Sequence, residues 1–332
     1  MAATSKSSKG SKKKGKKGKK GKKKGFDPQS LIKPGIYAGI GIVALAILVG
    51  IAIWLRSTAG VQAFIARYPG EAPLPEGAPV GLPGWLGWQH FLNFFFMLLI
   101  IRSGLLILTT QKPDSFWTRD NTKLVKTKGD PVKMSMNHLI HFSFDFLWVI
   151  NGIVFFVLLF ATGQWMRIVP TTWEVFPNAL SAAIQYLSMN WPAENGWVNY
   201  NSLQVLAYFT TVFIAAPLAM ISGYRLSEIW PIKGEFNNVF SIRIATVIHV
   251  SVMVYFLAFT FVHVFLVFAT SVVNGHGLFG NLSHTFGAQE HAPLLGFIWF
   301  AVAIVAMAAA WVLIRPVFIA PVAGRFGKVT TR

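Results

Sequence analysis

The sequence contains no cysteine and has few acidic residues. Its 332 residues include 12 Asp and Glu against 30 Lys and Arg, which gives a formal net charge of +18. Without cysteine, the chain itself cannot hold thiolate-bound iron–sulfur clusters, attach haem through a CxxCH motif or form internal disulfides. Any redox cofactor of this chain must therefore be held by other ligands.

The positive charge is concentrated at the N-terminus. Twelve lysines lie between Lys6 and Lys24, in a tract without an apolar residue to bury, so we expect residues 1–30 to form a disordered tail. A nucleic-acid-binding arm is one interpretation of such a run. An apolar segment follows within about ten residues, which favours a cytoplasmic retention signal that contacts anionic membrane lipid, and no nucleic acid as partner.

The remainder of the chain is strongly apolar. Hydrophobic residues make up 54% of the sequence and the mean hydropathy is +0.52, which indicates a multi-pass protein of the cell membrane. Segments long enough to span a bilayer lie at about 35–56, 85–109, 136–164, 200–222, 244–272 and 294–315. The first has the basic flank of a signal peptide, but its apolar run exceeds the usual length, so we interpret it as a retained anchor.

Basic residues alternate between the connections and predict the orientation. The connections that follow the second, fourth and sixth spans are rich in Lys and Arg, whereas 273–293 has neither. Because basic connections stay in the cytoplasm, we expect both termini there.

The fifth span carries a histidine at each end, in "HVSVMVYFLAFTFVH" from His249 to His263. Fourteen helical residues rise about 21 Å and complete almost four turns, so both imidazoles lie on nearly the same face. Polar groups are costly in hydrocarbon, and such a pair suits two stacked haems that each need a second axial imidazole. His90 begins the second span at the depth of His263, and His138 and His141 begin the third span at the depth of His249.

Three further histidines, His276, His284 and His291, fall in the connection 273–293. Exposed loop histidines are the ordinary interpretation, and a metal site is the alternative.

The spans resemble the cytochrome b subunits of formate dehydrogenases, which are related to the b-type cytochromes of membrane-bound nickel hydrogenases. The stretches "WQHFLNFFFMLLIIRSGL" and "LIHFSFDFLWVINGI" look like the first two core helices of that family. The resemblance covers about 85–275 and implies a four-helix core with two haems b. It implies His90, His263, His141 and His249 as axial ligands, with His138 as the alternative to His141. Asp145 stands where the family usually has glycine.

The stretch "YNSLQVLAYF" at 200–209 resembles the family's Tyr-Asn-x-Gly-Gln-Lys stretch at a quinone pocket. The resemblance implies Asn201 and Gln204, together with His263, as quinone-binding residues. Leu203 and Val205 replace the usual glycine and lysine. The alternative is that the two amides are ordinary polar residues at the membrane interface.

Three charged residues within or beside the spans have two interpretations each. Asp145 lies one turn from His141 and either accepts a proton from the ligand's other ring nitrogen or faces water. Arg102 and Arg243 either pair with haem propionates or extend to the membrane boundary.

We therefore expect an all-α membrane protein, a four-helix di-haem bundle with one extra helix at each end and six spans in total. The expected divisions are a tail (1–30), a leading helix with its outer connection (31–84), the di-haem core (85–275) and an outer loop, sixth helix and C-terminus (276–332).

The resemblance implies an electron-transfer subunit that is not catalytically complete alone. It would connect menaquinone or ubiquinone with an iron–sulfur subunit and a molybdopterin catalytic subunit of formate dehydrogenase type. The extra leading helix inverts the core, so we expect quinone at the outer haem and docking at the cytoplasmic connection 110–134, which is otherwise a plain basic loop. The alternatives are a cytochrome of a hydrogenase or another molybdopterin oxidoreductase, a haem-free proton-coupled transporter, or a membrane anchor. The direction of electron flow is open.

Overall fold

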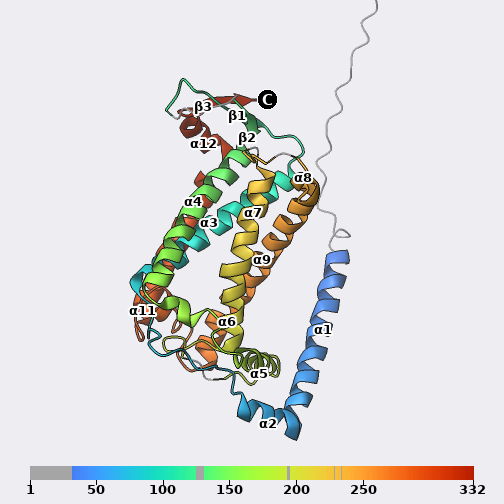
Figure 1. Cartoon of the computed structure of the whole chain (residues 1–332), viewed down its shortest axis with the longest axis vertical. Helices are drawn as coiled ribbons and strands as arrows, with labels where there is room; N and C mark the ends of the chain where they lie inside the picture. Colours follow the sequence, from blue (N-terminus) through green and yellow to red (C-terminus); the bar gives the residue numbers. More distant parts are fainter. Residues whose placement is uncertain (1–31, 125–130, 193–194, 228, 233) are drawn as a thin grey trace, which may run out of the picture. The chain divides into compact units, whose positions relative to one another are not determined.

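A computed structural model describes residues 32–124, 131–192, 195–227, 229–232 and 234–332 (Figure 1). The lysine-rich tail expected at 1–30 lies outside the described residues.

Six apolar helices are long enough to cross a bilayer, as the sequence predicts, and the chain is a multi-pass membrane protein. They are α1 (Ile32–Ser57), α3 (Gly84–Thr109), α4 (Met136–Ala161), the continuous run Ser202–Leu226, α9 (Ile242–Val273) and α11 (Pro293–Leu313). The run Ser202–Leu226 comprises α6 (Ser202–Phe209), a π-helical turn η3 (Thr210–Ala215) and α7 (Ala216–Leu226). Lipid accounts for the many apolar side chains that remain exposed on these helices.

The chain divides near residue 50 into two units. The first unit contains most of α1, whose described side chains are almost all exposed, as in a helix covered by lipid. The second unit begins with the last turns of α1 and the short helix α2 (Ala59–Arg67) and contains everything that follows.

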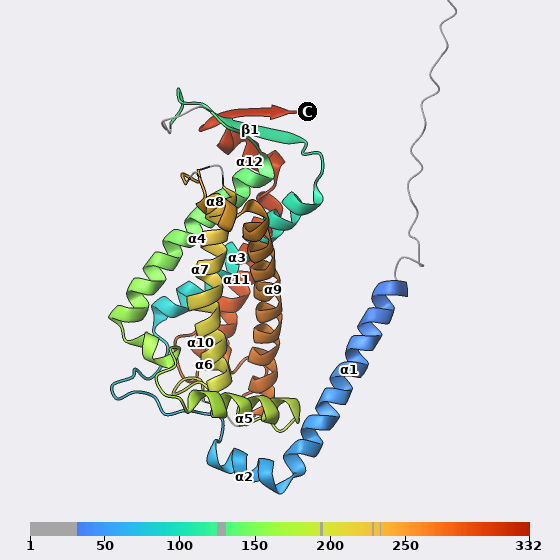
Figure 2. The same ribbon diagram turned by 45° about the vertical axis from the view of Figure 1, so that its right-hand side comes forward.

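The second unit is built around a helical bundle (Figures 1 and 2). Helix α3 packs along α4, and α7 packs along α9, while α11 lies beside α3. One core cluster joins α3, η3 and α9 through Ile101, Ala215, Val252 and Phe256. A second cluster joins α3 and α11 through Leu99, Met307 and Ala310.

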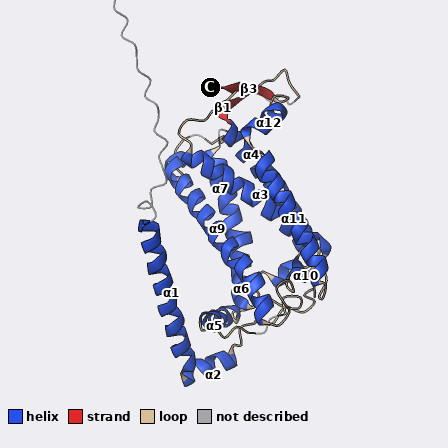
Figure 3. Ribbon diagram, turned by 180° about the vertical axis from the view of Figure 1, so that it is seen from behind, coloured by secondary structure: helices blue, strands red, loops and turns tan. Residues whose placement is uncertain are grey.

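The two ends of the bundle carry different structures. At one end, which we call the α5 end, lie η2 (Gln164–Arg167), α5 (Val175–Leu187) and α10 (Leu282–Thr285). At the other, which we call the sheet end, lie β1 (Ser115–Arg119), β2 (Lys133–Ser135), α8 (Phe236–Val239), α12 (Pro316–Ala323) and β3 (Gly327–Thr331). Figure 3 shows how the few strands contrast with the helical remainder.

The sheet is a feature that the sequence analysis did not predict. Its three antiparallel strands have the order β2-β1-β3, so the C-terminal strand closes onto the connection 110–134. Trp117 is buried under the sheet, where its Nε1 donates to the carbonyl oxygen of Ala323 at 3.0 Å. Gly327 lies against the Trp117 indole, and any side chain there would collide with it. The described parts of the connection 110–134 thus include two strands.

Candidate functional site

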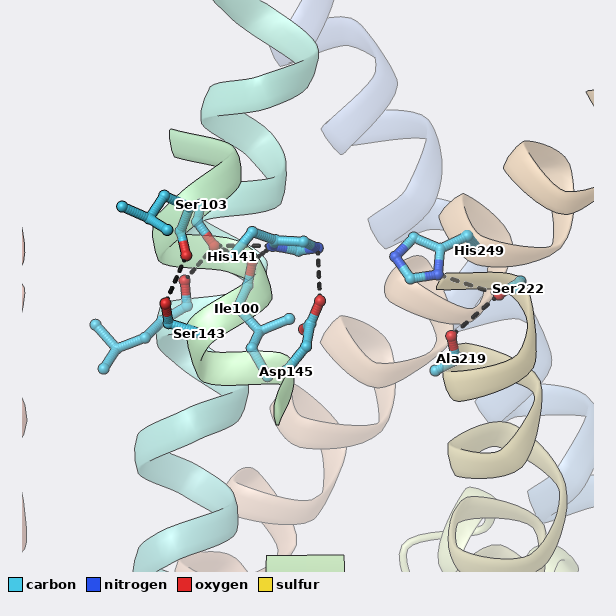
Figure 4. Close-up of polar contacts among 10 residues, drawn as sticks. Ile100, Ser103, His141, Ser143, Asp145, Ala219, Ser222 and His249 are labelled. Atoms are coloured by element: carbon cyan, nitrogen blue, oxygen red, sulfur yellow. Dashed lines mark hydrogen bonds and ion pairs between the residues drawn. The ribbon is translucent and has the colours of Figure 1, made fainter. Parts of the chain in front are cut away.

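At the sheet end of the bundle, His141 of α4 faces His249 of α9 (Figure 4). The ring centroids are 6.2 Å apart and the ring planes are inclined by 75°. Two metal–imidazole bonds of about 2 Å each, with about 1 Å from each nitrogen to its ring centre, give a separation of about 6 Å. The separation of the two rings therefore matches the one that two imidazoles would need to hold one metal ion between them.

A serine on the neighbouring helix orients His141. Its Nδ1 lies 2.9 Å from Ser103 Oγ and 3.1 Å from the carbonyl oxygen of Ile100. Ser103 Oγ has its single proton committed to its own helix, where the carbonyl oxygens of Leu99 and Ile100 both lie at 2.9 Å. The hydroxyl and the Ile100 carbonyl are thus acceptors for Nδ1–H, which leaves the Nε2 lone pair for a metal.

The same arrangement recurs at His249. Its Nδ1 lies 3.1 Å from Ser222 Oγ (Figure 4). The hydroxyl of Ser222 donates to the carbonyl oxygen of Leu218 at 2.6 Å. Ser222 therefore also accepts from Nδ1–H, and the Nε2 lone pair of His249 remains available. Fixing the tautomer of a ligating histidine in this way is the usual work of groups around a metal site.

A glycine follows each of these serines and gives the imidazole room. A Cβ added to Gly104 would lie 3.3 Å from Cε1 of His141, and one added to Gly223 would lie 3.1 Å from Cε1 of His249. In each Ser-Gly dipeptide, the serine accepts a hydrogen bond from the imidazole and the glycine leaves space for the imidazole ring. Ser103-Gly104 lies in the stretch "WQHFLNFFFMLLIIRSGL" that carries the resemblance, but the sequence analysis did not identify either Ser103-Gly104 or Ser222-Gly223 as a site feature, although the repeated dipeptide in two spans was a visible signal.

The α5 end holds the second predicted pair, His90 and His263. His90 lies near the start of α3 and His263 lies toward the end of α9, and the approach of the two imidazoles to each other remains a prediction. The Nδ1 of His90 is 2.9 Å from the carbonyl oxygen of Leu86, so its proton is on Nδ1 and its Nε2 is available. His263 stacks on Phe259 with centroids 5.5 Å apart and planes 7° apart, and meets the edge of Tyr208 at 5.9 Å.

The two pairs lie at different depths with an apolar layer between them. On α9, His249 and His263 are separated by fourteen residues, or about 21 Å of helix. Val252 and Phe256 lie between them and belong to the core cluster with Ile101.

Among the described residues, no group of three or more His, Asp or Glu side chains could hold a metal ion. Paired histidines match an iron porphyrin instead, because the porphyrin supplies four nitrogen ligands and the protein needs to supply only the two axial ones. The donor set therefore fits haem better than a bare metal ion.

His138 is engaged locally. Its Nδ1 lies 2.7 Å from the hydroxyl of Ser135, the N-cap residue of α4, and that hydroxyl also accepts from the backbone N–H of His138. His141 faces His249, and the choice of His141 over His138 as the ligand remains a prediction.

Asp145 lies on a different side of His141 from the one we expected for a proton acceptor. Its Oδ2 is 3.6 Å from Nε2, the nitrogen that faces His249, and not beside Nδ1. Ser103 and the Ile100 carbonyl already receive the Nδ1 proton. The proton-accepting role considered for Asp145 therefore belongs to Ser103.

The two arginines have separate environments. Arg102 donates from Nη1 to the carbonyl oxygen of Ile314 at 2.6 Å and lies 4.9 Å from the ring centroid of Trp311, which fastens α3 to the end of α11. Arg243 is exposed in the first turn of α9. Propionate contacts for either residue remain predictions.

Asn201 and Gln204 form the capping box that begins α6. Asn201 Oδ1 accepts from the backbone N–H of Gln204 at 2.8 Å, and Gln204 Oε1 accepts from the backbone N–H of Asn201 at 3.1 Å. Asn201 is fully buried and donates from Nδ2 to the hydroxyl of Tyr186 at 3.2 Å. Both amides thus have a structural role, and their quinone-binding role remains a prediction.

A buried arginine at the α5 end escaped the sequence analysis. Arg167 is 1% exposed and donates to the carbonyl oxygens of Gly81 and Gly196, each at 2.7 Å. Its guanidinium lies 4.6 Å from the ring centroid of Tyr200. Burial raises the pKa of Tyr200, and the positive charge of Arg167 partly opposes that rise. Arg167 ties the segments around residues 81 and 196 together.

His276, His284 and His291 do come together, around a pocket of about 440 Å³ that Glu290 also lines. Burial lowers the pKa of His284, against the opposing effect of a hydrogen bond from its Nε2 to the carbonyl oxygen of Glu290 at 3.2 Å. The metal alternative for this loop has no support in the part of the chain that the structure describes.

A bundle of membrane-spanning helices with paired histidines spaced for haem iron defines the class of membrane b-type cytochromes. Residues 81–279 match the family model of prokaryotic cytochrome b561, and because this is more than half of the chain, the protein belongs to that family. It is therefore a membrane electron-transfer protein that binds haem b. No curated protein and no solved structure matches the chain.

Proposed function

We propose that this cytochrome carries electrons across the membrane through two haems b. His141 and His249 would hold one haem, and His90 and His263 the other. The observation that carries the proposal is the 6.2 Å separation of the His141 and His249 rings, with the Nδ1 of each committed to a serine. When bound, each haem supplies a one-electron redox centre.

The residues around the pairs hold the imidazoles neutral and fixed. Ser103 and Ser222 accept hydrogen bonds from the Nδ1–H groups of His141 and His249. Each Nε2 would then be the donor to iron, and the hydrogen bond would raise the basicity of that nitrogen. Gly104 and Gly223 let the rings lie directly against the neighbouring helices. An apolar cluster around Phe256 lies between the two levels.

We further propose that the sheet end faces the cytoplasm and that both termini lie on that side. The exposed residues at the sheet end include Lys112, Lys133, Arg325 and Lys328, whereas the connection 273–293 at the α5 end has neither Lys nor Arg. Positive connections favour the cytoplasmic side.

Partners follow from the resemblance and from the surface at each end. The sheet end would dock an iron–sulfur subunit that connects to a molybdopterin catalytic subunit of formate dehydrogenase type. The α5 end would react with menaquinone or ubiquinone near His263, Asn201 and Gln204. The contact of Tyr208 with His263 supports this end, because it brings the α6 segment against the ligand. The alternative partner is a hydrogenase or another molybdopterin oxidoreductase.

Haem content of the purified full-length chain tests the assignment. A pyridine haemochrome assay should give two haems b per polypeptide. His263→Leu and His249→Leu should each abolish one component of the reduced-minus-oxidised spectrum, and His138→Leu, the matched control at the same end of α4, should spare both. A colourless protein after haem-replete expression would instead support a transporter or an anchor.

Orientation can be measured directly because the chain has no native cysteine. Single cysteines at Lys112 and at Glu174, both exposed, report on the sheet end and the α5 end. In intact cells, a membrane-impermeant maleimide should label Glu174→Cys and leave Lys112→Cys unlabelled until the cells are lysed. The opposite pattern would reverse the proposed orientation.

A further inference from the structure

The sheet at the sheet end arranges three polar residues in one row. Thr118 in the central strand β1 pairs with Lys133 of β2 on one side and with Lys328 of β3 on the other. Directly paired residues point to the same face of a sheet, and adjacent strands lie about 4.8 Å apart. The two lysines therefore flank Thr118 on one face, with their backbones about 10 Å apart.

The opposite face of the sheet is covered. Trp117, Met134 and Val329 alternate with that row and pack in a cluster with Ile319 and Ala323 of α12. The sheet is thus amphipathic, and its polar face is directed away from the apolar cluster.

That polar face contains a pocket of about 360 Å³ with an excess of positive charge. Its lining includes the cations Arg119, Lys133 and Lys328 and the carboxylate of Asp120. Arg119 lies two residues from Trp117 on β1 and therefore points to the other face of the sheet, so the two lysines against one carboxylate leave one net positive charge on this face. The Oδ1 of Asp120 accepts from the backbone N–H of Thr122 at 2.9 Å and from its hydroxyl at 2.6 Å, so one oxygen of the carboxylate is engaged within its own turn.

The same lining contains the side chain of Thr330. Thr330 Oγ1 is buried and has no hydrogen-bond partner among the described residues. Buried hydroxyls are nearly always hydrogen-bonded, so each exception needs an explanation. Thr330 lies two residues from Lys328 on β3, and hence on the same face of the sheet.

We propose that this pocket binds a phosphate group. Lys133 and Lys328 would contact it from either side, and the hydroxyl of Thr330 would complete the site as a donor. A phosphate carries the one or two negative charges that the pocket lacks, and its several oxygens can accept from ammonium and hydroxyl groups together. The group would come either from an anionic phospholipid headgroup, for which basic pockets beside spanning helices are suited, or from a soluble phosphorylated molecule.

The first test measures binding of inorganic phosphate to the purified full-length chain by calorimetry. The variant K133Q/K328Q should bind phosphate at least tenfold more weakly than the wild-type chain. The control K112Q/R325Q removes the same charge from exposed positions outside the pocket lining and should change binding less than twofold. Because the lysine-rich segment 6–24 is common to all of these proteins, its unspecific contribution cancels in the comparison.

The second test removes only the hydroxyl. Thr330→Val keeps the charge and the shape, so it should weaken phosphate binding severalfold while leaving the unfolding temperature unchanged or higher. Equal phosphate affinity in Thr330→Val and wild type, or equal losses in the two double variants, would overturn the proposal. So would competition by poly-glutamate as effective as that by phosphate, because the pocket would then be a general surface for acidic protein segments.

The source is identified by nanodisc reconstitution. If the wild-type chain retains phosphatidylglycerol in preference to phosphatidylcholine, and if K133Q/K328Q loses that preference while K112Q/R325Q keeps it, the ligand is a lipid headgroup. Phosphate binding without that lipid preference supports a soluble phosphorylated ligand. Both readouts are independent of haem, so the outcome is separate from that of the electron-transfer proposal.

Discussion

Substituting alanine for the glycines beside the histidines should separate haem binding from folding. At Gly223 the new Cβ would lie 3.1 Å from His249 Cε1, and at Gly104 it would lie 3.3 Å from His141 Cε1. Carbon atoms prefer at least about 3.5 Å, so the rings must retreat by about 0.4 and 0.2 Å. His249 cannot retreat freely, because its Nδ1 is bonded to Ser222.

Such overpacking costs about 1–3 kcal/mol, which corresponds to haem retention weakened roughly 5- to 150-fold. In the same helices, replacing glycine by alanine favours the helix by about 1 kcal/mol. We therefore expect Gly223→Ala to lose haem while its helical content and unfolding temperature in detergent stay at or above wild type. Gly104→Ala should lose less haem than Gly223→Ala.

The assay is haem titration of the apoprotein followed by absorbance, with thermal unfolding followed by circular dichroism. Gly50→Ala in α1 is the control, because a Cβ there meets nothing within 4 Å. If Gly223→Ala binds both haems as tightly as Gly50→Ala does, the inferred contact between α7 and an axial ligand is wrong.

Three further expectations concern groups around the sites. Ser103→Ala and Ser222→Ala should each weaken haem binding by about 10- to 100-fold, since groups that orient a metal-bound histidine have effects of that size. Haem titration of the apoprotein measures this loss, and unaltered affinity in both variants would contradict the assigned tautomers. Arg167→Met should lower the free energy of unfolding by about 2–4 kcal/mol, because it removes two short hydrogen bonds from buried carbonyl oxygens. Denaturant unfolding in detergent measures the change, and a change below about 0.5 kcal/mol would contradict the structural role of Arg167. Burial lowers the pKa of His284 in the folded chain, so on acidification the unfolded chain takes up the proton first. Stability should therefore fall as the pH drops below about 6.5, until the pH has passed the pKa of His284 in the folded chain. Comparing unfolding temperatures at pH 7.5 and 5.5 should show a smaller fall in His284→Asn than in wild type, and equal falls would refute the expectation.

Hydropathy and helical rise were sufficient for the spans and for placing His141 at the level of His249. The six apolar runs are each longer than a soluble helix requires, so their identity does not depend on tertiary contacts. His249 and His141 meet because each lies near the same end of its span, and a regular rise of 1.5 Å per residue makes that depth predictable.

The sheet was not predictable in the same way. Its strands have three to five residues, and β3 pairs with a strand more than 200 positions earlier in the chain. Short segments carry little periodicity, and non-local pairing depends on how the spans bring the two connections together.

The pattern Asn201-x-x-Gln204 illustrates a different kind of omission. An Asn followed three residues later by Gln, before an apolar run, is also the sequence signature of a helix start. The structure contains that cap, which accounts for both amides without a ligand. The serines at 103 and 222 carried too weak a signal, because serine is common in spans and its function here depends on the imidazole of another helix.

Quantitative electron paramagnetic resonance of the oxidised full-length protein tests the central claim most directly, because it reports the axial ligands of each iron. Two low-spin ferric signals of bis-imidazole type, each integrating to one spin per polypeptide and one of them lost in His249→Leu, are the result that we predict. A single signal, or a predominantly high-spin spectrum in the wild-type chain, would contradict two histidine-ligated haems.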